Sequence, residues 1–314
     1  MKKKIITALI IVLLILIVVL AIALGKDKPI GTVIGGGNEI GLINISGVIV
    51  SGSSGSDFLG GSHTGSASII DQLRKASENP NMPAVILYMN SPGGSAAASL
   101  EIGNEIQRLR EEGKVVVSYM SDVAASGAYW IACETDLIIA NPSTMTGSIG
   151  VIMQTMNLEE FYDMIGIDTN VVKSGEHKDM GAPHRDITEK EEAIFQSMVD
   201  DIYQQFLEVV SKSRKMDIER VKELADGRVY TGRQAFEVGL VDNLGDMHYA
   251  VEIAADLAGI EGEPNIVNMT PVSFWDEVFG QILFDRGFYL QDIIGANYVR
   301  PMLLPLRIAG SEIK

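Results

Sequence analysis

Hydrophobic residues in this chain fall into short apolar runs separated by longer segments of mixed character. The runs predict strands at residues 42–50, 84–90, 114–120, 136–140 and 167–173. The mixed segments predict helices over about 67–78 and 96–112, a short helix near Ala124, and a long amphipathic helix from Thr188, where Thr188 and Glu191 form a capping box. Strands that alternate with helices are typical of βαβ units, so we expect a mostly parallel sheet covered by helices. Residues 231–245 predict a further helix, a glycine stop, an edge strand and a turn.

The N-terminus predicts a membrane anchor. Three lysines, residues 2–4, precede an apolar run from Ile5 to Leu24 whose only polar member is Thr7. Twenty helical residues span about 30 Å, the thickness of a bilayer's hydrocarbon core. The lysines are expected to stay in the cytoplasm, which places the rest of the chain outside. The alternative is a cleaved signal peptide, for which Ala21-Ile22-Ala23 supplies a small-x-small site, although the apolar region of a signal peptide is usually shorter.

These signals divide the chain into four parts. Residues 1–25 form the cytoplasmic stub and transmembrane anchor, 26–41 a glycine-rich linker, 42–260 the main α/β domain and 261–314 a C-terminal tail. Within the main domain, the Gly/Ser-rich stretch 51–66 is expected to be a flexible connection, with a flap over a site as the alternative. For the aromatic-rich tail segment 273–310 we expect packing on another subunit, with lipid contact or entry of its apolar end into a site as alternatives.

Composition excludes several classes of function. The formal net charge of −16 would repel the phosphates of nucleic acid, so DNA or RNA binding is not expected. The single cysteine, Cys133, can form neither an internal disulfide nor a thiolate zinc site, and no metal-binding spacing occurs. The glycines of the linker lack the full dinucleotide-binding spacing. We therefore expect neither a metal ion nor a cofactor.

Two segments at predicted strand-to-helix turns could carry chemistry. In "NSPGGS" (90–95), the proline and glycines permit a sharp turn with free N–H groups, which can stabilise an oxyanion. In "DVAASGAYW" (122–130), Ser126 lies among small residues that allow a substrate carbonyl to approach its hydroxyl. Each segment has a structural alternative: a tight turn for the first, and a helix-capping or close-packing serine for the second. The nucleophile-elbow pattern of α/β hydrolases is absent, because residue 124 is Ala.

A serine nucleophile needs a base, and "KSGEHKDMG" (173–181) offers two adjacent ones, His177 and Lys178. The other histidines are His63, His184 and His248, of which only His184 shares this loop. Lysine has a reference pKa of about 10.4, so a lysine base that works near pH 7–8 needs its pKa lowered by about 3. Burial can do this only if no carboxylate pairs with the lysine, and Glu176 and Asp179 both flank Lys178.

Five segments occur in an informative order: "NSPGGS", "DVAASGAYWIAC", "TGSIGVI", "GEHKDMG" and "RVYTGRQAFEVGLVDNLG". Together they resemble the signal peptide peptidase A (SppA) family of membrane-anchored serine proteases, over about Ile43 to Ala255. The resemblance implies an α/β fold built as a ClpP/crotonase-like spiral of βαβ units, preceded by one N-terminal transmembrane helix. No second SPGG-like segment occurs, so the chain is similar to the short, single-domain form.

The resemblance also assigns roles to residues. Ser126 matches the family's nucleophile and Lys178 its general base, and His177 falls outside the matched role. Ser148 matches a serine that orients the lysine, while Gly94 and Gly127 match the oxyanion hole.

The implied substrates are signal peptides left in the membrane after cleavage, degraded on the extracytoplasmic side of the cell membrane. The implied assembly is a homo-oligomer, an octamer in short-form members, whose sites are formed partly by neighbouring subunits. Three alternatives remain: a related Ser–Lys protease that acts on other membrane or secreted peptides, an acyl-CoA enzyme of the crotonase kind, and an inactive scaffold.

Overall fold

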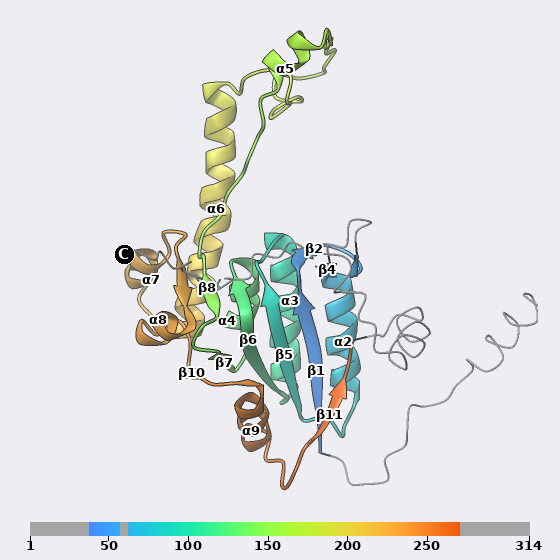
Figure 1. Ribbon diagram of the computed structural model, residues 1–314, viewed down its shortest axis with the longest axis vertical. Helices are drawn as coiled ribbons and strands as arrows, with labels where there is room; N and C mark the ends of the chain where they lie inside the picture. The colour runs from blue at the N-terminus through green and yellow to red at the C-terminus, as the bar shows by residue number, and fades with distance from the viewer. Residues whose placement is uncertain (1–37, 57–61, 271–314) are drawn as a thin grey trace, which may run out of the picture. The chain divides into compact units, whose positions relative to one another are not determined.

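The structure, a computed structural model, describes residues 38–56 and 62–270. Its main sheet runs in the order β10-β7-β6-β5-β1-β11, and every neighbouring pair is parallel (Figure 1). The strands of this path are β1 (Glu39–Ser46), β5 (Ala84–Ser91), β6 (Val115–Ala125), β7 (Leu137–Ala140), β10 (Asn243–Leu244) and β11 (Asn265–Asn268). The mostly parallel α/β sheet expected from the alternating pattern is confirmed.

Two crossover helices build the centre of this sheet. Helix α2 (Ser66–Glu78) connects β1 to β5, and α3 (Ala96–Glu111) connects β5 to β6. Successive residues of a strand point to opposite faces, and β5 buries both: Val85 and Leu87 join one hydrophobic cluster, whereas Ile86 joins the other. Burial on both faces explains why this segment is a continuous apolar run in the sequence.

Helices cover both faces of the sheet. The larger cluster includes buried residues of α2, α3, α4 (Gly127–Cys133), α6 (Glu189–Arg214) and α7 (Ile218–Leu224). The smaller one lies under α9 (Met247–Leu257), which lies across the other face (Figure 1). Beside β6, strand β8 (Met145–Gly147) pairs parallel with β6 and antiparallel with β9 (Val229–Thr231), which leads into α8 (Gly232–Glu237).

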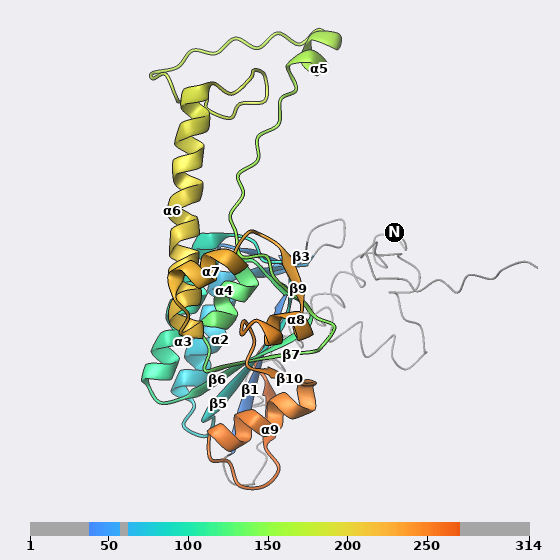
Figure 2. The same cartoon turned by 90° about the vertical axis from the view of Figure 1, so that its left-hand side faces the viewer.

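Residues 151–188 form an arm that leaves the body after β8 and returns along the long helix α6. It carries one short helix, α5 (Glu159–Met164), near the end of α6 that lies farthest from the sheet (Figure 2). Helix α6 begins with the predicted capping box: the Thr188 hydroxyl accepts the Glu191 N–H, and the Glu191 carboxylate accepts the Thr188 N–H. At about 1.5 Å per residue, its 26 residues span roughly 39 Å.

Three expectations are wrong in detail. Residues 167–173 form no strand but an exposed segment of the arm, because no strand among the described residues pairs with them. The predicted strand 42–50 is interrupted at Gly47, which separates β1 from β2 (Val48–Val50). The stretch 51–66 is not a simple loop, since β3 (Gly55–Ser56) and β4 (Ser62–Gly65) pair with β2 or each other in a small sheet.

Several predictions concern residues outside those described, which include residues 1–37 with the anchor and most of the linker. Residues 57–61 of the Gly/Ser-rich stretch and residues 271–314 of the tail belong to this group, although β11 adds the described residues 265–268 to the main sheet. Within the described ranges, no helix is both long enough and apolar enough to cross a bilayer, and the anchor expected at residues 5–24 lies outside them.

Candidate active site

The carboxyl ends of β5 and β6 define the candidate site. These strands are adjacent and parallel, so the turn after β5 (residues 92–95) and the turn after β6 (Ser126) lie at the same edge of the sheet. A cavity of about 800 Å³ opens at this edge. Its lining includes Gly94, Ser126, Gly127 and Ser148, four of the five residues for which the sequence predicted a role.

The backbone of Ser126 is strained. Its dihedral angles, φ 54° and ψ −122°, lie in a region that residues with a side chain rarely adopt, at a cost of about 1–3 kcal/mol. Two backbone hydrogen bonds hold it there: Ser126 N–H donates to Gly147 O at 2.8 Å, and Ser126 O accepts from Trp130 N at 3.0 Å. Although Ser126 precedes the first residue of α4, its hydroxyl makes no capping hydrogen bond. The capping alternative is therefore not realised, and the turn leaves the hydroxyl uncommitted at the cavity wall.

Two glycines allow the neighbouring turn to pack against Ser126. A Cβ on Gly93, whose φ is +99°, would lie 2.7 Å from Ala125 O and 2.8 Å from Gly127 N. A Cβ on Gly94 would lie 2.1 Å from Ile49 O. The strand residue Ile49 holds this turn on both sides, because Ile49 N donates to Gly93 O and Ser95 N donates to Ile49 O, each at 2.9 Å. A side chain at either glycine would push the turn away from the nucleophile.

The N–H groups of Gly94 and Gly127 are free donors beside Ser126. Gly127 is the first residue of α4, where a backbone N–H has no intrahelical acceptor, and neither group donates to any acceptor among the described residues. They are also close together, since a Cβ built on Gly127 would lie 3.3 Å from Gly94 N. Two fixed donors next to a nucleophile form the arrangement that stabilises a developing oxyanion.

The wall that α6 contributes to the cavity is mixed, with Gln196 and Asp200 beside apolar and aromatic side chains. Helix α6 contributes Val199, Tyr203 and Phe206, which lie at helical spacing on one face. Phe206 packs against Trp130 with ring centroids 4.9 Å apart, and both rings are buried. The apolar and aromatic part of this wall suits the apolar side chains of an extended peptide.

Lys178 lies on the arm and does not line this cavity. Its side chain is exposed and makes no hydrogen bond or ion pair within the described residues. The loop around it is tied to the beginning of α6, where Glu176 contacts Lys190 at 3.3 Å. Along α6, Glu191 is 15 residues or roughly 22 Å from Phe206, and 5 residues from Gln196, the first cavity-lining residue of the helix. A single chain therefore brings together the nucleophile and the oxyanion donors, but not the predicted base.

The two carboxylates that flank Lys178 are bound elsewhere. Asp179 accepts from Arg185 at 2.9 Å and from Lys173 at 2.7 Å, and these hydrogen bonds hold the pKa of its carboxyl well below the usual range. The Glu176 carboxylate forms an ion pair with Lys190 at 3.3 Å and lies 3.9 Å from His177 Nε2. The sequence-based requirement that these groups leave Lys178 unpaired is therefore met.

No histidine among the described residues lines the cavity. His177 is exposed on the arm, and His184 is half-buried in the same loop. His63 lies in β4, and His248 on α9 faces Glu252 at 3.3 Å. Within the described chain, Ser126 thus has no histidine partner for a Ser–His mechanism.

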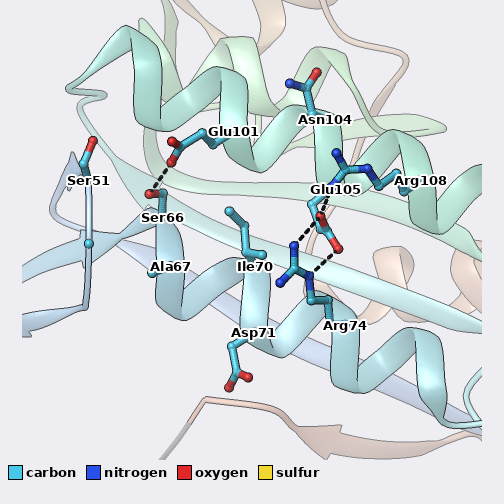
Figure 3. Close-up of a pocket in the computed structure, with 11 residues that line it drawn as sticks. Ser51, Ser66, Ala67, Ile70, Asp71, Arg74, Glu101, Asn104, Glu105 and Arg108 are labelled. Carbon is cyan, nitrogen blue, oxygen red and sulfur yellow. Dashed lines mark hydrogen bonds and ion pairs between the residues drawn. The ribbon is translucent and has the colours of Figure 1, made fainter.

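A second cavity, between α2 and α3, holds charged groups that satisfy one another (Figure 3). Arg74 and Arg108 both donate to Glu105, and Ser66 Oγ donates to Glu101 at 2.8 Å. Burial raises the pKa of Glu105, but the hydrogen bonds from the two arginines outweigh it and the pKa lies below its ordinary value. Because these groups are committed to one another, this cavity offers no uncommitted nucleophile and base.

Comparison with known proteins agrees with the geometry at the sheet edge. The model of peptidase family S49 matches residues 108–261, a segment that contains Ser126, Ser148 and Lys178. A putative protease of Synechocystis sp. is 40% identical over 198 residues, which cover 63% of this chain and 71% of that protein. The chain belongs to peptidase family S49. It is accordingly a member of a serine peptidase family, and the predicted resemblance is confirmed.

Other S49 relatives match over a smaller share of their length. A putative signal peptide peptidase SppA of Enterococcus faecium is 36% identical over 211 residues, 67% of this chain and 60% of that protein. Protease 4 of Haemophilus influenzae is 36% identical over 240 residues, which cover 76% of this chain but only 38% of that protein. The S49 match thus covers most of this chain but only part of the longer relatives.

Several contributors to this S49 site were not identified from the sequence. Ile49 hydrogen-bonds to the glycine turn from a strand distant in sequence. The cavity residues Tyr203 and Phe206 lie far along the chain from the segments that contain Gly94 and Ser126. Arg185 binds Asp179 from six residues away, and its only local signal is a single cation after the "HKDMG" segment.

Proposed function

We propose that this S49 chain is a membrane-anchored serine endopeptidase with a Ser–Lys dyad that degrades signal peptides after their release. The observation that carries the proposal is Ser126, held in a strained turn between two free N–H donors in a cavity without a histidine. The chemistry and the family favour lysine as the base. The name of the E. faecium relative supports the substrate class.

The reaction follows from these groups. Neutral Lys178 takes the proton of Ser126 as the hydroxyl oxygen attacks a peptide carbonyl. The N–H groups of Gly94 and Gly127 hold the oxyanion of the tetrahedral intermediate. Lys178 then protonates the leaving amine, and water hydrolyses the acyl-enzyme to release the second fragment and restore Ser126. Ser148, which lines the same cavity at φ 50°, orients the lysine when it is docked.

Lys178 reaches the cavity from a neighbouring copy of the chain. The arm that carries it exposes large apolar side chains, which in an isolated chain would face water: Ile152, Met156, Phe161, Met164 and Val172 are each more than half exposed. Apolar surface of this kind marks an interface. A ring of subunits, an octamer by resemblance to the short-form family, would cover the arm and place each lysine beside the next subunit's serine. Docking would also remove the lysine from water, which favours its neutral form.

The fold and location complete the proposal. The parallel sheet with crossover helices supports a ClpP/crotonase-like spiral. The apolar segment 5–24 would anchor the enzyme in the cell membrane, with the catalytic domain on the extracytoplasmic side, beside membrane-retained signal peptides. An extended peptide would bind along the cavity by adding a strand, with apolar side chains against Trp130 and Phe206.

The test uses the full chain in detergent and a fluorogenic peptide with a signal-peptide core sequence. Ser126→Ala and Lys178→Ala are each expected to abolish turnover, whereas His177→Ala keeps most of it. Subunits of the two inactive variants, mixed and reassembled, should recover part of the activity, because one supplies the serine and the other the lysine. A mixture of Ser126→Ala with a Ser126→Ala/Lys178→Ala double variant is the matched control and stays inactive.

Three outcomes would contradict the proposal. Full activity of Lys178→Ala would reject the lysine base, and a mixture without recovered activity would reject a base from the neighbouring subunit. Efficient cleavage of unrelated peptides with no cleavage of signal-peptide sequences would favour the alternative, a Ser–Lys protease for other membrane or secreted peptides.

A further inference from the structure

Arg185 lies at the centre of the ion-pair network that shapes the loop around Lys178. It donates to the Asp179 carboxylate through Nη2 at 2.9 Å and Nε at 3.3 Å. It also donates to both oxygens of Glu191, at 2.7 and 2.9 Å, and to the Asp186 carbonyl at 2.9 Å. One guanidinium therefore bridges the residue next to Lys178 and the first turn of α6.

The α6 end of this bridge is rigid. The Glu191 side chain is only 3% exposed, and it also accepts the Thr188 N–H in the capping box. Hydrogen bonds from Arg185 and from the Thr188 backbone lower the pKa of Glu191 to about 2, so it stays ionised and holds the guanidinium. Arg185 itself is only 24% exposed and cannot easily swing away. The position of Arg185 is thus set by the helix, and Asp179 follows it.

Without Arg185, the Asp179 carboxylate would be available to pair with Lys178. The two residues are adjacent in sequence, and a carboxylate within about 4–6 Å of a lysine favours the charged ammonium. An ammonium cannot accept the proton of a serine. In the structure, both oxygens of Asp179 are occupied, by Arg185 and by Lys173, and Lys178 has no ion pair within the described residues.

We propose that Arg185 is a positioning residue for the Ser–Lys reaction, which holds the Asp179 carboxylate away from Lys178 and so keeps that lysine available as a neutral base. The inference rests on the proposed function, because it presumes that Lys178 is the base. Other charged groups near the loop, from the loop itself and from α6, are Lys173, Glu176, His177, Lys190 and Glu191. Of the acidic ones, Glu176 lies with Lys190, and Asp186 in the same loop accepts from Asn157. Glu191 keeps the Thr188 N–H when Arg185 is lost, so Asp179, next to Lys178 in the sequence, is the carboxylate that this loss makes available to Lys178.

The test compares pH profiles of kcat/KM for the full chain in detergent. In Arg185→Ala the freed Asp179 pairs with Lys178, so the midpoint of the rising limb moves up. We expect a shift of about one pH unit, the low end for such a pair because Lys173 remains, and hence about tenfold less activity on the acidic limb. In Arg185→Ala/Asp179→Asn the carboxylate is gone, and the midpoint returns to the wild-type value. Arg185→Lys is expected to lie between wild type and Arg185→Ala.

Asp179→Asn separates this role from a merely structural one. A structural clamp predicts the same defect whichever partner is removed. The proposal instead predicts that Asp179→Asn keeps its midpoint at or below the wild-type value. Arg74→Ala is the matched control, because Arg74 also binds a carboxylate, Glu105, but lies between α2 and α3, and its profile should be unchanged.

The proposal is overturned if the Arg185→Ala midpoint stays at the wild-type value, if the double variant keeps the upward shift, or if Asp179→Asn shifts upward as Arg185→Ala does. If Arg185→Ala does not fold, Asp179→Asn and Arg185→Lys decide by the same midpoints. An active Lys178→Ala variant would instead remove the proposed base itself. An inactive Lys178→Ala beside an unshifted Arg185→Ala would reject only the role of Arg185.

Discussion

Gly94→Ala is the substitution that most directly probes the turn beside the nucleophile. Gly94 lies in the contact between the turn after β5 and strand residue Ile49, and its N–H is one of the two free donors beside Ser126. An alanine Cβ at this position would lie 2.1 Å from Ile49 O and 2.7 Å from Ile49 N. Both atoms belong to the backbone, so no side-chain rotation can relieve the contact.

The size of the effect follows from these distances. Non-bonded heavy atoms pack best at about 3.5 Å or more, so a contact of 2.1 Å forces the turn and the strand apart by about 1.4 Å. The hydrogen bonds from Ile49 N to Gly93 O and from Ser95 N to Ile49 O, both 2.9 Å, would be lost or weakened, at about 1 kcal/mol each. A displaced donor near a reacting carbonyl costs about 10²–10³ in kcat.

Steady-state hydrolysis of the fluorogenic peptide measures this loss, and thermal unfolding shows how much stability is lost. The matched control is Gly113→Ala: Gly113 also has a positive φ, +89°, but a Cβ there meets nothing within 4 Å. Gly113→Ala thus has the backbone strain of a side chain at positive φ but no steric collision. We expect its kcat to equal that of the wild type. A wild-type kcat for Gly94→Ala would refute the assignment of this turn to the catalytic site.

Three further predictions concern stability and reactivity. Phe206→Ala removes a buried ring that packs on Trp130, and chemical denaturation should show a loss of about 3–5 kcal/mol; an unchanged midpoint would contradict this packing. The pKa of Glu191 is lowered from 4.5 to about 2, so its contribution to the free energy of unfolding is complete above about pH 4.5 and is lost as the pH falls towards 2. Glu191→Gln should therefore make the free energy of unfolding depend less on pH in that range. An equally steep pH dependence in the variant would contradict this prediction. Burial raises the pKa of Cys133 to about 12, so its thiol is protonated and unreactive in the native protein. A thiol reagent at pH 8 should therefore label the native protein far more slowly than the unfolded chain. Equal labelling rates would show that the thiol is accessible.

Local patterns were sufficient to predict much of the scaffold. The predictions of β5 from its apolar run and of the helix start from Thr188 and Glu191 are both confirmed, because an apolar run and a capping box are visible within a few residues of sequence. The prediction of a strand at residues 167–173 is wrong, because a local pattern does not show whether a partner strand is present. Ile167, Val171 and Val172 in this segment suggest a strand, but the segment lies on the arm, where no strand among the described residues pairs with it.

The candidate site also combines features that local sequence predicts with features that it does not. Motif order was enough to single out Ser126, Ser148, Gly94 and Gly127, and the fold brings all four to one cavity. The sequence could not show that Ser126 adopts φ 54°, since this strain is imposed by hydrogen bonds with Gly147 and Trp130.

By itself, then, the sequence determined the central strands and their crossover helices, and which residues lie at the strand ends where chemistry is possible. Tertiary structure alone decided that Ile49 hydrogen-bonds to the glycine turn, that Arg185 joins Asp179 to the first turn of α6, and that Lys178 lies outside the cavity of its own chain. The reason is physical: periodicity and capping report interactions within a few residues. Ile49 and the glycine turn are far apart in the sequence, and the position of the arm with its ion pairs exists only once the sheet, the arm and α6 are folded.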